Sequence, residues 1–323
     1  MQLGVFDPIF GALPLEPMLD RVVGLGLDAV ELGTGNYPGD ARCRPADLLA
    51  DATARDRLVD AFASRGLSIS ALSCHGNPVH PDPARAAHDD TIYRDTVRLA
   101  SELGVGVVNV FAGCPGDGPG ASRPSWVASS WPPEFVETLD WQWEAVVLPY
   151  WRDIAAFATA HGVRFGIEME PGFVVYNPRS FERLRSAIGN IIGLNLDPSH
   201  LFWQGIDPID TIRRLGPAIV HVDAKDTVVN DANVRADGLL DLPPRDDHAA
   251  RPWIFRSVGI GHDLAFWTTF VAALRDGDYD GVISIEHEDP LLSVDDGLRV
   301  AAETLREAIR AVPETSPAAP EQR

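Results

Sequence analysis

The sequence is poor in cysteine, and the three that it has are Cys43, Cys74 and Cys114. Their odd number and their spacings match neither a disulfide framework nor a zinc-binding pattern. Reduced thiols are the simplest interpretation, and they are typical of the cytoplasm. The cysteines therefore argue against a small secreted domain held together by disulfides.

Long apolar runs are also absent. No stretch approaches the ~20 apolar residues that a membrane-spanning helix needs. The first ten residues, MQLGVFDPIF, have neither the basic segment nor the long apolar segment of a signal peptide. We therefore expect a cytoplasmic protein without a membrane partner.

Basic side chains are scarce, since 27 Lys and Arg face 47 Asp and Glu and give a formal net charge of −20. A chain this acidic repels nucleic acid and anionic lipid surfaces, so we expect no nucleic-acid partner. The simplest role of the excess negative charge is solubility.

What the sequence does contain is a repeated boundary between helix-like and strand-like segments. A helical pattern ends at a glycine, and an apolar, β-branched run follows, as at Gly26, Gly66, Gly104 and Gly162 and more weakly at Gly189. Together with the remaining apolar runs, this boundary predicts eight strands. They lie near residues 2–6, 29–32, 68–73, 107–111, 164–169, 192–197, 219–223 and 281–286.

Helical patterns separate the predicted strands. One apolar stripe runs from Ile92 to Leu103, and another runs from Val294 to Ile309, where Ser293 and Asp296 resemble a helix-capping pair. Alternating strands and helices imply parallel strands with right-handed crossovers.

Eight such units predict an α/β fold with a single (β/α)8 TIM barrel. An open doubly wound sheet is the competing fold, but no glycine-rich phosphate fingerprint follows the first strand. We expect the barrel to occupy residues 1–312, with long inserts near 112–140 and 224–261, and a Pro-rich, disordered tail at 313–323.

Acidic residues follow several of the predicted strands. Glu168, Asp197, Asp223 and Glu286 end strands five to eight, and carboxyl ends of neighbouring strands meet at the mouth of a barrel. Four carboxylates at one place repel one another unless protons or a cation intervene. Oxygen ligands suit a hard divalent ion, so the cluster predicts a Mg²⁺ or Mn²⁺ site.

The register of these strands stays open, because side chains two apart share a face. Either member of three pairs could reach the ion, namely Glu168 or Glu170, His221 or Asp223, and Glu286 or Glu288.

Five motifs together resemble the xylose isomerase-like TIM-barrel superfamily, and its sugar phosphate isomerase/epimerase branch in particular. They are GIEMEP, NLDPSHLFWQGIDP, IVHVDAKDT, RPWIFRSVGIGHD and GVISIEHEDP. The resemblance implies a divalent ion held by Glu168, Asp197, Asp223 and Glu286. It further implies that His200 and Arg256 bind the substrate.

The chain departs from that family pattern at two positions. Relatives commonly read HVHAKD and IEMHP, whereas this chain has Asp223 and Glu170 in place of the histidines. Both changes add negative charge at the predicted mouth. They bear on the metal preference and on the substrate.

Other candidates have weaker support. His75, Asn109 and Lys225 are candidate substrate contacts, and each is equally compatible with a structural role. The aromatic residues Trp203, Trp253 and Phe6 fit either an apolar wall for a sugar or ordinary core packing.

The resemblance implies a sugar or keto-sugar isomerase or epimerase that removes a proton next to a carbonyl. Glu168 and Glu286 would be the catalytic carboxylates, and the reaction would pass through an enediolate. The same enolate could also expel a leaving group, as in a keto-glycoside lyase or a keto-inositol dehydratase.

Two further alternatives are less well supported. One is a sugar-binding subunit without catalytic activity. The other is an endonuclease of the same superfamily, but the net negative charge of the chain argues against DNA binding. The sequence leaves the oligomeric state open, and a homo-oligomer is one alternative.

Overall fold

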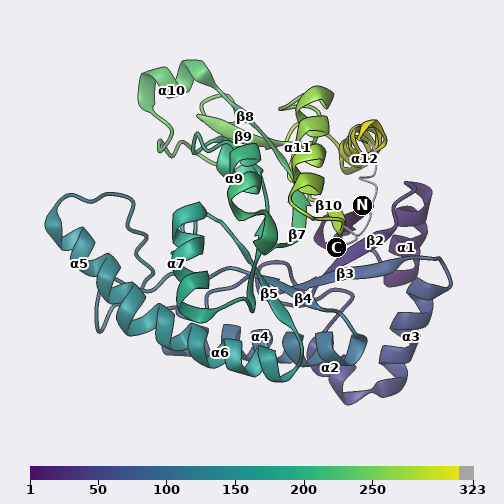
Figure 1. Cartoon of the computed structure of the whole chain (residues 1–323), viewed down its shortest axis with the longest axis horizontal. Coiled ribbons are helices and arrows are strands. Elements are labelled where there is room, and N and C mark those ends of the chain that lie inside the picture. Colours follow the sequence, from purple (N-terminus) through teal and green to yellow (C-terminus); the bar gives the residue numbers. More distant parts are fainter. Residues whose placement is uncertain (313–323) are drawn as a thin grey trace, which may run out of the picture.

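Eight parallel strands close into a barrel in the computed structural model, which describes residues 1–312 (Figure 1). Going around the barrel, the strands follow the order β1-β10-β7-β6-β5-β4-β3-β2. The closed barrel confirms the predicted (β/α)8 fold over the open sheet. The predicted disordered tail at 313–323 lies outside the described residues.

The strands of the barrel match the predicted runs to within one residue at either end. They are β1 (Gln2–Phe6), β2 (Ala29–Gly33), β3 (Ser68–Ser73), β4 (Val107–Val110), β5 (Arg164–Glu168), β6 (Ile192–Leu196), β7 (Ile219–Ala224) and β10 (Val282–Ile285).

Helices surround the barrel. The longer ones are α1 (Leu15–Gly24), α3 (Ala52–Ala63), α4 (Pro83–Leu103), α5 (Pro133–Trp141), α6 (Leu148–Ala160), α7 (Pro178–Ile188), α9 (Pro208–Leu215), α11 (Leu264–Asp276) and α12 (Val294–Ala311). Shorter ones are α2 (Pro45–Ala50), α8 (Ser199–Phe202) and α10 (Asp231–Asp237), with single turns η1 (Asp7–Phe10), η2 (Gln142–Val147) and η3 (Gly216–Ala218). The hydroxyl of Ser293 accepts a hydrogen bond from the Asp296 amide, which confirms the predicted cap of α12.

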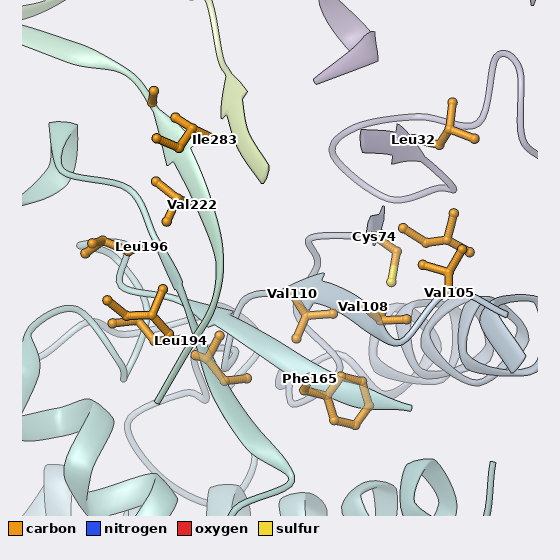
Figure 2. Close-up of a cluster of buried hydrophobic side chains, with 14 of the residues drawn as sticks. Leu32, Cys74, Val105, Val108, Val110, Phe165, Leu194, Leu196, Val222 and Ile283 are labelled. Atoms are coloured by element: carbon orange, nitrogen blue, oxygen red, sulfur yellow. The ribbon is translucent and has the colours of Figure 1, made fainter. Parts of the chain in front are cut away.

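The strands alternate between an apolar outer face and a polar inner face. Val108 and Val110 of β4, and Leu194 and Leu196 of β6, belong to the buried hydrophobic cluster between the strands and the helices (Figure 2). The residues between them, such as Asn109, point the other way, into the barrel. The buried polar residues of this interior are Glu31, Ser73, Asn109, Glu168, Asn195, His221, Asp223 and Ser284.

The two predicted inserts carry extra structure. The first leads from β4 into α5, and the second contains an antiparallel pair, β8 (Asp226–Val229) and β9 (Trp253–Arg256), with α10 between them. In Figure 1 this hairpin and α10 project together from one end of the molecule. The Thr227 hydroxyl donates to the Ser199 carbonyl at 2.9 Å, which ties the hairpin to α8 after β6.

Within residues 1–312, no helix is both long enough and apolar enough to span a bilayer.

A buried ion pair fixes the chain that follows β1. Asp7 is 2% exposed, and its carboxylate accepts from the Gly33 amide at 2.7 Å and from Arg42 Nε at 2.5 Å. The Arg42 guanidinium also donates to the carbonyls of Gly11 and Leu13. One arginine therefore links the ends of β1 and β2 and the loop between β1 and α1.

We expect Arg42→Leu to destabilise the fold by about 3–5 kcal/mol, because it leaves the Asp7 carboxylate buried without its cation. Chemical denaturation followed by circular dichroism measures the change. Arg44→Leu is the matched control, since Arg44 forms exposed ion pairs with Asp40 and Asp47 and should cost about 1 kcal/mol or less. Equal losses in the two variants would contradict the assigned role of the buried pair.

Candidate active site

A cavity of about 470 Å³ lies at the carboxyl ends of the barrel strands. Its walls combine carboxylates, imidazoles and one lysine with several aromatic rings. The lining residues are Phe6, Pro8, Ile9, Tyr37, Pro38, His75, Phe111, Glu168, Glu170, His200, Lys225, Arg245, Phe255, Glu286, His287 and Glu288. Active sites of TIM barrels lie at this end of the strands, so we take this cavity as the candidate active site.

Glu168, the last residue of β5, lies between two imidazoles. Its Oε2 is 2.8 Å from His75 Nε2, and its Oε1 is 3.1 Å from His200 Nε2. Burial alone would raise the pKa of Glu168, but the charges and hydrogen bonds of His75 and His200 hold that pKa well below its ordinary value. Glu168 is therefore ionised over the whole physiological range.

Lys225 lies between two of the predicted carboxylates. Its Nζ is 3.1 Å from Asp197 Oδ2 and 2.9 Å from Glu286 Oε1, and it is the only lysine in the chain. Burial would lower the pKa of Lys225, but Asp197 and Glu286 raise it well above its ordinary value. Lys225 is thus a fixed positive charge in the floor of the cavity. The carboxylate of the next residue, Asp226, accepts from the His262 amide and ring instead.

His200, in the short helix after β6, faces three carboxylates at once. Its Nε2 is 3.1 Å from Glu168, 2.6 Å from Glu170 and 3.0 Å from Asp197. One ring nitrogen carries at most one hydrogen, so it cannot donate to all three oxygens. Burial opposes protonation of His200, yet Glu170 and Asp197 raise its pKa well above the ordinary value.

These groups fit a divalent cation. One ligand atom from each of Glu168, Asp197 and His200 lies within 4.8 Å of the other two, and all three residues are buried. Carboxylate oxygens with one imidazole nitrogen are a donor set that Mn²⁺ and other first-row divalent ions accept. The close approach of three carboxylates to one imidazole also shows an excess of negative charge that such an ion would offset.

Asp223 belongs to a deeper cluster with Glu31 and His221. His221 Nε2 is 3.8 Å from Glu31 Oε2, His221 Nδ1 is 3.6 Å from Asp223 Oδ1, and ligand atoms of all three residues lie within 4.8 Å of one another. Burial and the negative charge of Glu31 raise the pKa of Asp223 well above its ordinary value.

The strand register explains why Asp223 lies below the mouth. Asp223 pairs with Ser284 on β10, two residues before Glu286. The residue that reaches the level of Glu286 is therefore Lys225, which directly follows β7 and lies two positions after Asp223. Asn195 links the deeper cluster to the mouth of the barrel, because its Nδ2 is 2.6 Å from Asp223 Oδ2 and 3.4 Å from Glu168 Oε2.

The substrate-binding candidates divide between the cavity and the scaffold. His75, His200 and Lys225 line the cavity, as expected for substrate contacts. Arg256 is not among its lining residues, and Arg256 Nε donates to Asp289 at 2.9 Å instead. Asn109 lies inside the barrel, where its Nδ2 donates to Glu31 at 2.9 Å.

Aromatic rings line the cavity beside the charged groups. Phe111 packs against His75 at 4.6 Å and stacks on Phe173 at 4.3 Å between ring centroids. On the other side, Lys225 Nζ lies 4.7 Å from the centre of the Phe255 ring. Apolar rings beside a few convergent polar groups are typical of small-molecule sites.

The sequence named Glu170 only as the alternative to Glu168, and it gave Arg245 and Glu31 no role. Glu170, 25% exposed, lines the cavity beside His200; Arg245 reaches it from the second insert; and Glu31 completes the deeper cluster. The strand pattern did place Glu31 at the end of the second strand. Its partners, however, come from the opposite side of the barrel, which single-strand periodicity cannot show.

A comparison with known families decides the classification of this fold. The family model described as a xylose isomerase-like TIM barrel matches residues 19–310. The chain belongs to this family. The match confirms the resemblance that the five sequence motifs indicated.

One curated relative covers nearly the whole xylose isomerase-like barrel. The uncharacterized protein YfiH of Bacillus subtilis (strain 168) is 38% identical over 312 residues, which are 96% of this chain and 99% of that protein.

Solved structures of the same fold are more distant in sequence. A D-tagatose 3-epimerase-like protein has a TM-score of 0.65 at 19% identity, covering 96% of this chain and 98% of that one. The IolI protein, solved with a bound zinc atom, has a TM-score of 0.64 at 16% identity over 96% and 99%. A probable 3-DHS dehydratase, AsbF of Bacillus anthracis, has a TM-score of 0.63 at 17% identity over 95% and 99%.

Proposed function

We propose that this protein is a divalent-metal-dependent isomerase or epimerase of a sugar or keto-sugar. The observation that carries the proposal is the 470 Å³ cavity that Glu168, His200, Lys225 and Glu286 line. Asp197, buried beside it, contacts both His200 and Lys225. The epimerase-like, IolI and dehydratase structures of the same fold support chemistry of this class.

Glu168, Asp197 and His200 would hold the ion, with Glu286 beside them across Lys225. The zinc atom in the IolI structure and the donor set here both support a divalent ion, for which Mn²⁺ and Mg²⁺ remain our candidates. Asp223, the further ligand implied by the family motif, contributes only if its carboxylate turns from Glu31 toward the mouth. When bound, the ion supplies positive charge for the oxygens of the reacting carbonyl and its neighbouring hydroxyl.

The protein's own groups would move the proton. Glu286 and Glu168 both line the cavity, and we assign to them the removal and return of the proton next to the carbonyl. Return to the same carbon on the other face gives an epimer, and return to the neighbouring carbon gives an isomer. Lys225 keeps Glu286 in place and adds a second positive charge for the developing enediolate.

His75 would bind a substrate hydroxyl while holding Glu168 in position. The aromatic wall around Phe111 would exclude water from the opposite side of the sugar. Together these residues leave a space with one polar face and one apolar face, which suits a sugar ring.

A second candidate function is elimination from a keto-glycoside, in which the same enolate expels a group beta to the carbonyl. One observation favours it. A further cavity of about 810 Å³ shares Glu170, Arg245, Phe255 and Glu288 with the first, and so leaves room for an attached group.

Proton exchange in D₂O tests the proposal. The protein is incubated with Mn²⁺ and a panel of ketoses, keto-sugars and keto-glycosides, and NMR follows deuterium uptake at the carbon next to the carbonyl. We expect uptake with at least one compound, its loss on adding EDTA and its recovery with Mn²⁺. The product separates epimerisation, isomerisation and elimination. Uptake that is insensitive to EDTA would contradict the metal-dependent mechanism.

A further inference from the structure

The 810 Å³ cavity adjoins the candidate active site and has different walls. Its two largest side chains are Trp203, from the segment after β6, and Trp253, at the start of β9. Their rings are stacked, with centroids 4.6 Å apart and planes only 7° from parallel. Trp126, from the first insert, lines the cavity as well. Three tryptophans from separate parts of the chain therefore meet at one cavity.

The two cavities are continuous. Glu170, Arg245, Phe255 and Glu288 line both of them, so a ligand seated on the charged floor can extend past these residues toward the tryptophans. The polar groups that could process a carbonyl lie in the first cavity. The second cavity is the larger of the two, at about 810 Å³ against about 470 Å³, and is large enough for a ring system.

The second cavity favours an apolar ring over another sugar. Besides the tryptophans, its lining includes Leu239, Leu240 and Leu242. Leu240 and Leu242 are 62% and 92% exposed, which is unusual for leucines side by side at the mouth of a cavity. A bound apolar group would cover these side chains and so gain the free energy of removing them from water.

We infer that the second cavity binds an apolar aromatic ring attached to the sugar, so that the substrate is a keto-glycoside with an aromatic aglycone. This inference rests on the proposed function of the first cavity, which would hold the sugar. It specifies the substrate class, and it places the aglycone against Trp203 and Trp253.

Binding of non-reacting glycosides tests this inference without requiring turnover. Calorimetry with the full chain and Mn²⁺ compares 4-nitrophenyl β-D-glucoside, methyl β-D-glucoside and cellobiose, which present an aromatic ring, a methyl group and a second sugar to the cavity. We expect the nitrophenyl glucoside to bind at least tenfold more tightly than either of the others. Tighter binding of cellobiose, or no difference among the three, would overturn the inference.

Substitutions in the wall of the second cavity test whether the nitrophenyl ring binds there. Trp253→Ala should remove the preference for the nitrophenyl glucoside and leave the affinity for methyl glucoside unchanged. Leu240→Asp, at an exposed position, tests the same wall without risk to the core and should weaken nitrophenyl glucoside binding at least fivefold. Trp131→Ala is the control, because Trp131 is 75% exposed and does not line the cavity. A preference that survives both cavity variants would also overturn the inference.

The proposed function can fail separately. If the D₂O experiment shows no exchange with any compound but the nitrophenyl preference is present and depends on Trp253, the aromatic subsite stands and the isomerase proposal falls. If exchange occurs but the protein shows no preference for the nitrophenyl glucoside, the isomerase proposal stands and the aromatic subsite is rejected.

Discussion

Glu286→Gln should lower the rate of proton exchange next to the substrate carbonyl by about 10²–10⁴-fold, the usual range for loss of a general base. The substituted amide keeps the size of the side chain and can still accept from Lys225 Nζ, which lies 2.9 Å from Glu286 Oε1. The variant should therefore fold normally and still bind the substrate. Deuterium uptake by NMR at saturating substrate measures the loss, and a thermal melt checks the fold.

Glu288→Gln is the matched control for this variant. Glu288 also lines the cavity, but it is exposed and lies two residues further from the barrel. Its substitution should reduce exchange less than about tenfold. If Glu286→Gln takes up deuterium at the normal rate, or if the two variants lose equal activity, Glu286 is not the base.

Glu168→Gln should weaken binding of the divalent ion at least about a hundredfold. Substitution of a group that merely supports a ligand costs 10–100-fold in metal affinity, and loss of a ligand should cost no less. The Glu168 side chain is 5% exposed and lies between His75 and His200, whereas the Glu170 side chain is 25% exposed and pairs with His200 alone among residues 1–312. Glu170→Gln should therefore change the ion affinity less than tenfold.

The single lysine allows the ion affinities of Glu168→Gln and Glu170→Gln to be compared directly. Because Lys225 is the only lysine in the chain, protein grown with ¹³C-labelled lysine gives one side-chain signal from the floor of the cavity. Paramagnetic Mn²⁺ bound nearby should broaden that signal, and titration gives the affinity of each variant. Weaker binding in Glu170→Gln than in Glu168→Gln would instead select Glu170 as the ligand and reverse the assignment.

The sequence predicted the barrel well because the signals that define it are local. A glycine at the end of a helix and an apolar, β-branched run after it mark four of the eight units clearly, and Gly26, Gly66, Gly104 and Gly162 all adopt a positive φ in the structure. Strand positions followed directly from those boundaries. The order of the strands then followed from the right-handed crossovers of a parallel barrel.

The composition of the site was harder to predict because it depends on register. Asp223 pairs with Ser284, and this pairing places Lys225, two residues after Asp223, at the level of Glu286. The pairing between β6 and β7 also shifts between Leu194 and Asn195. Periodicity gives the face of a side chain but not its depth along the barrel. For the same reason, the sequence could not join Glu31 to His221 across the interior.

Arg256 shows a second limit. The family resemblance implied that Arg256 contacts the substrate. In the structure, β9 pairs with β8 in a hairpin separate from the barrel sheet, and Arg256 Nε donates a hydrogen bond to Asp289. The partner of a side chain in a long insert depends on how the insert folds back. Arg245, which does line the cavity, comes from that insert and had no recognisable pattern around it.

Anomalous diffraction from crystals grown with Mn²⁺ shows directly whether one divalent ion binds at the mouth of the barrel. We expect a single strong peak in contact with Glu168, Asp197 and His200, with Glu286 beside it. No peak at that position, or a peak confined to the deeper cluster of Glu31, His221 and Asp223, would rule out the proposed ion site.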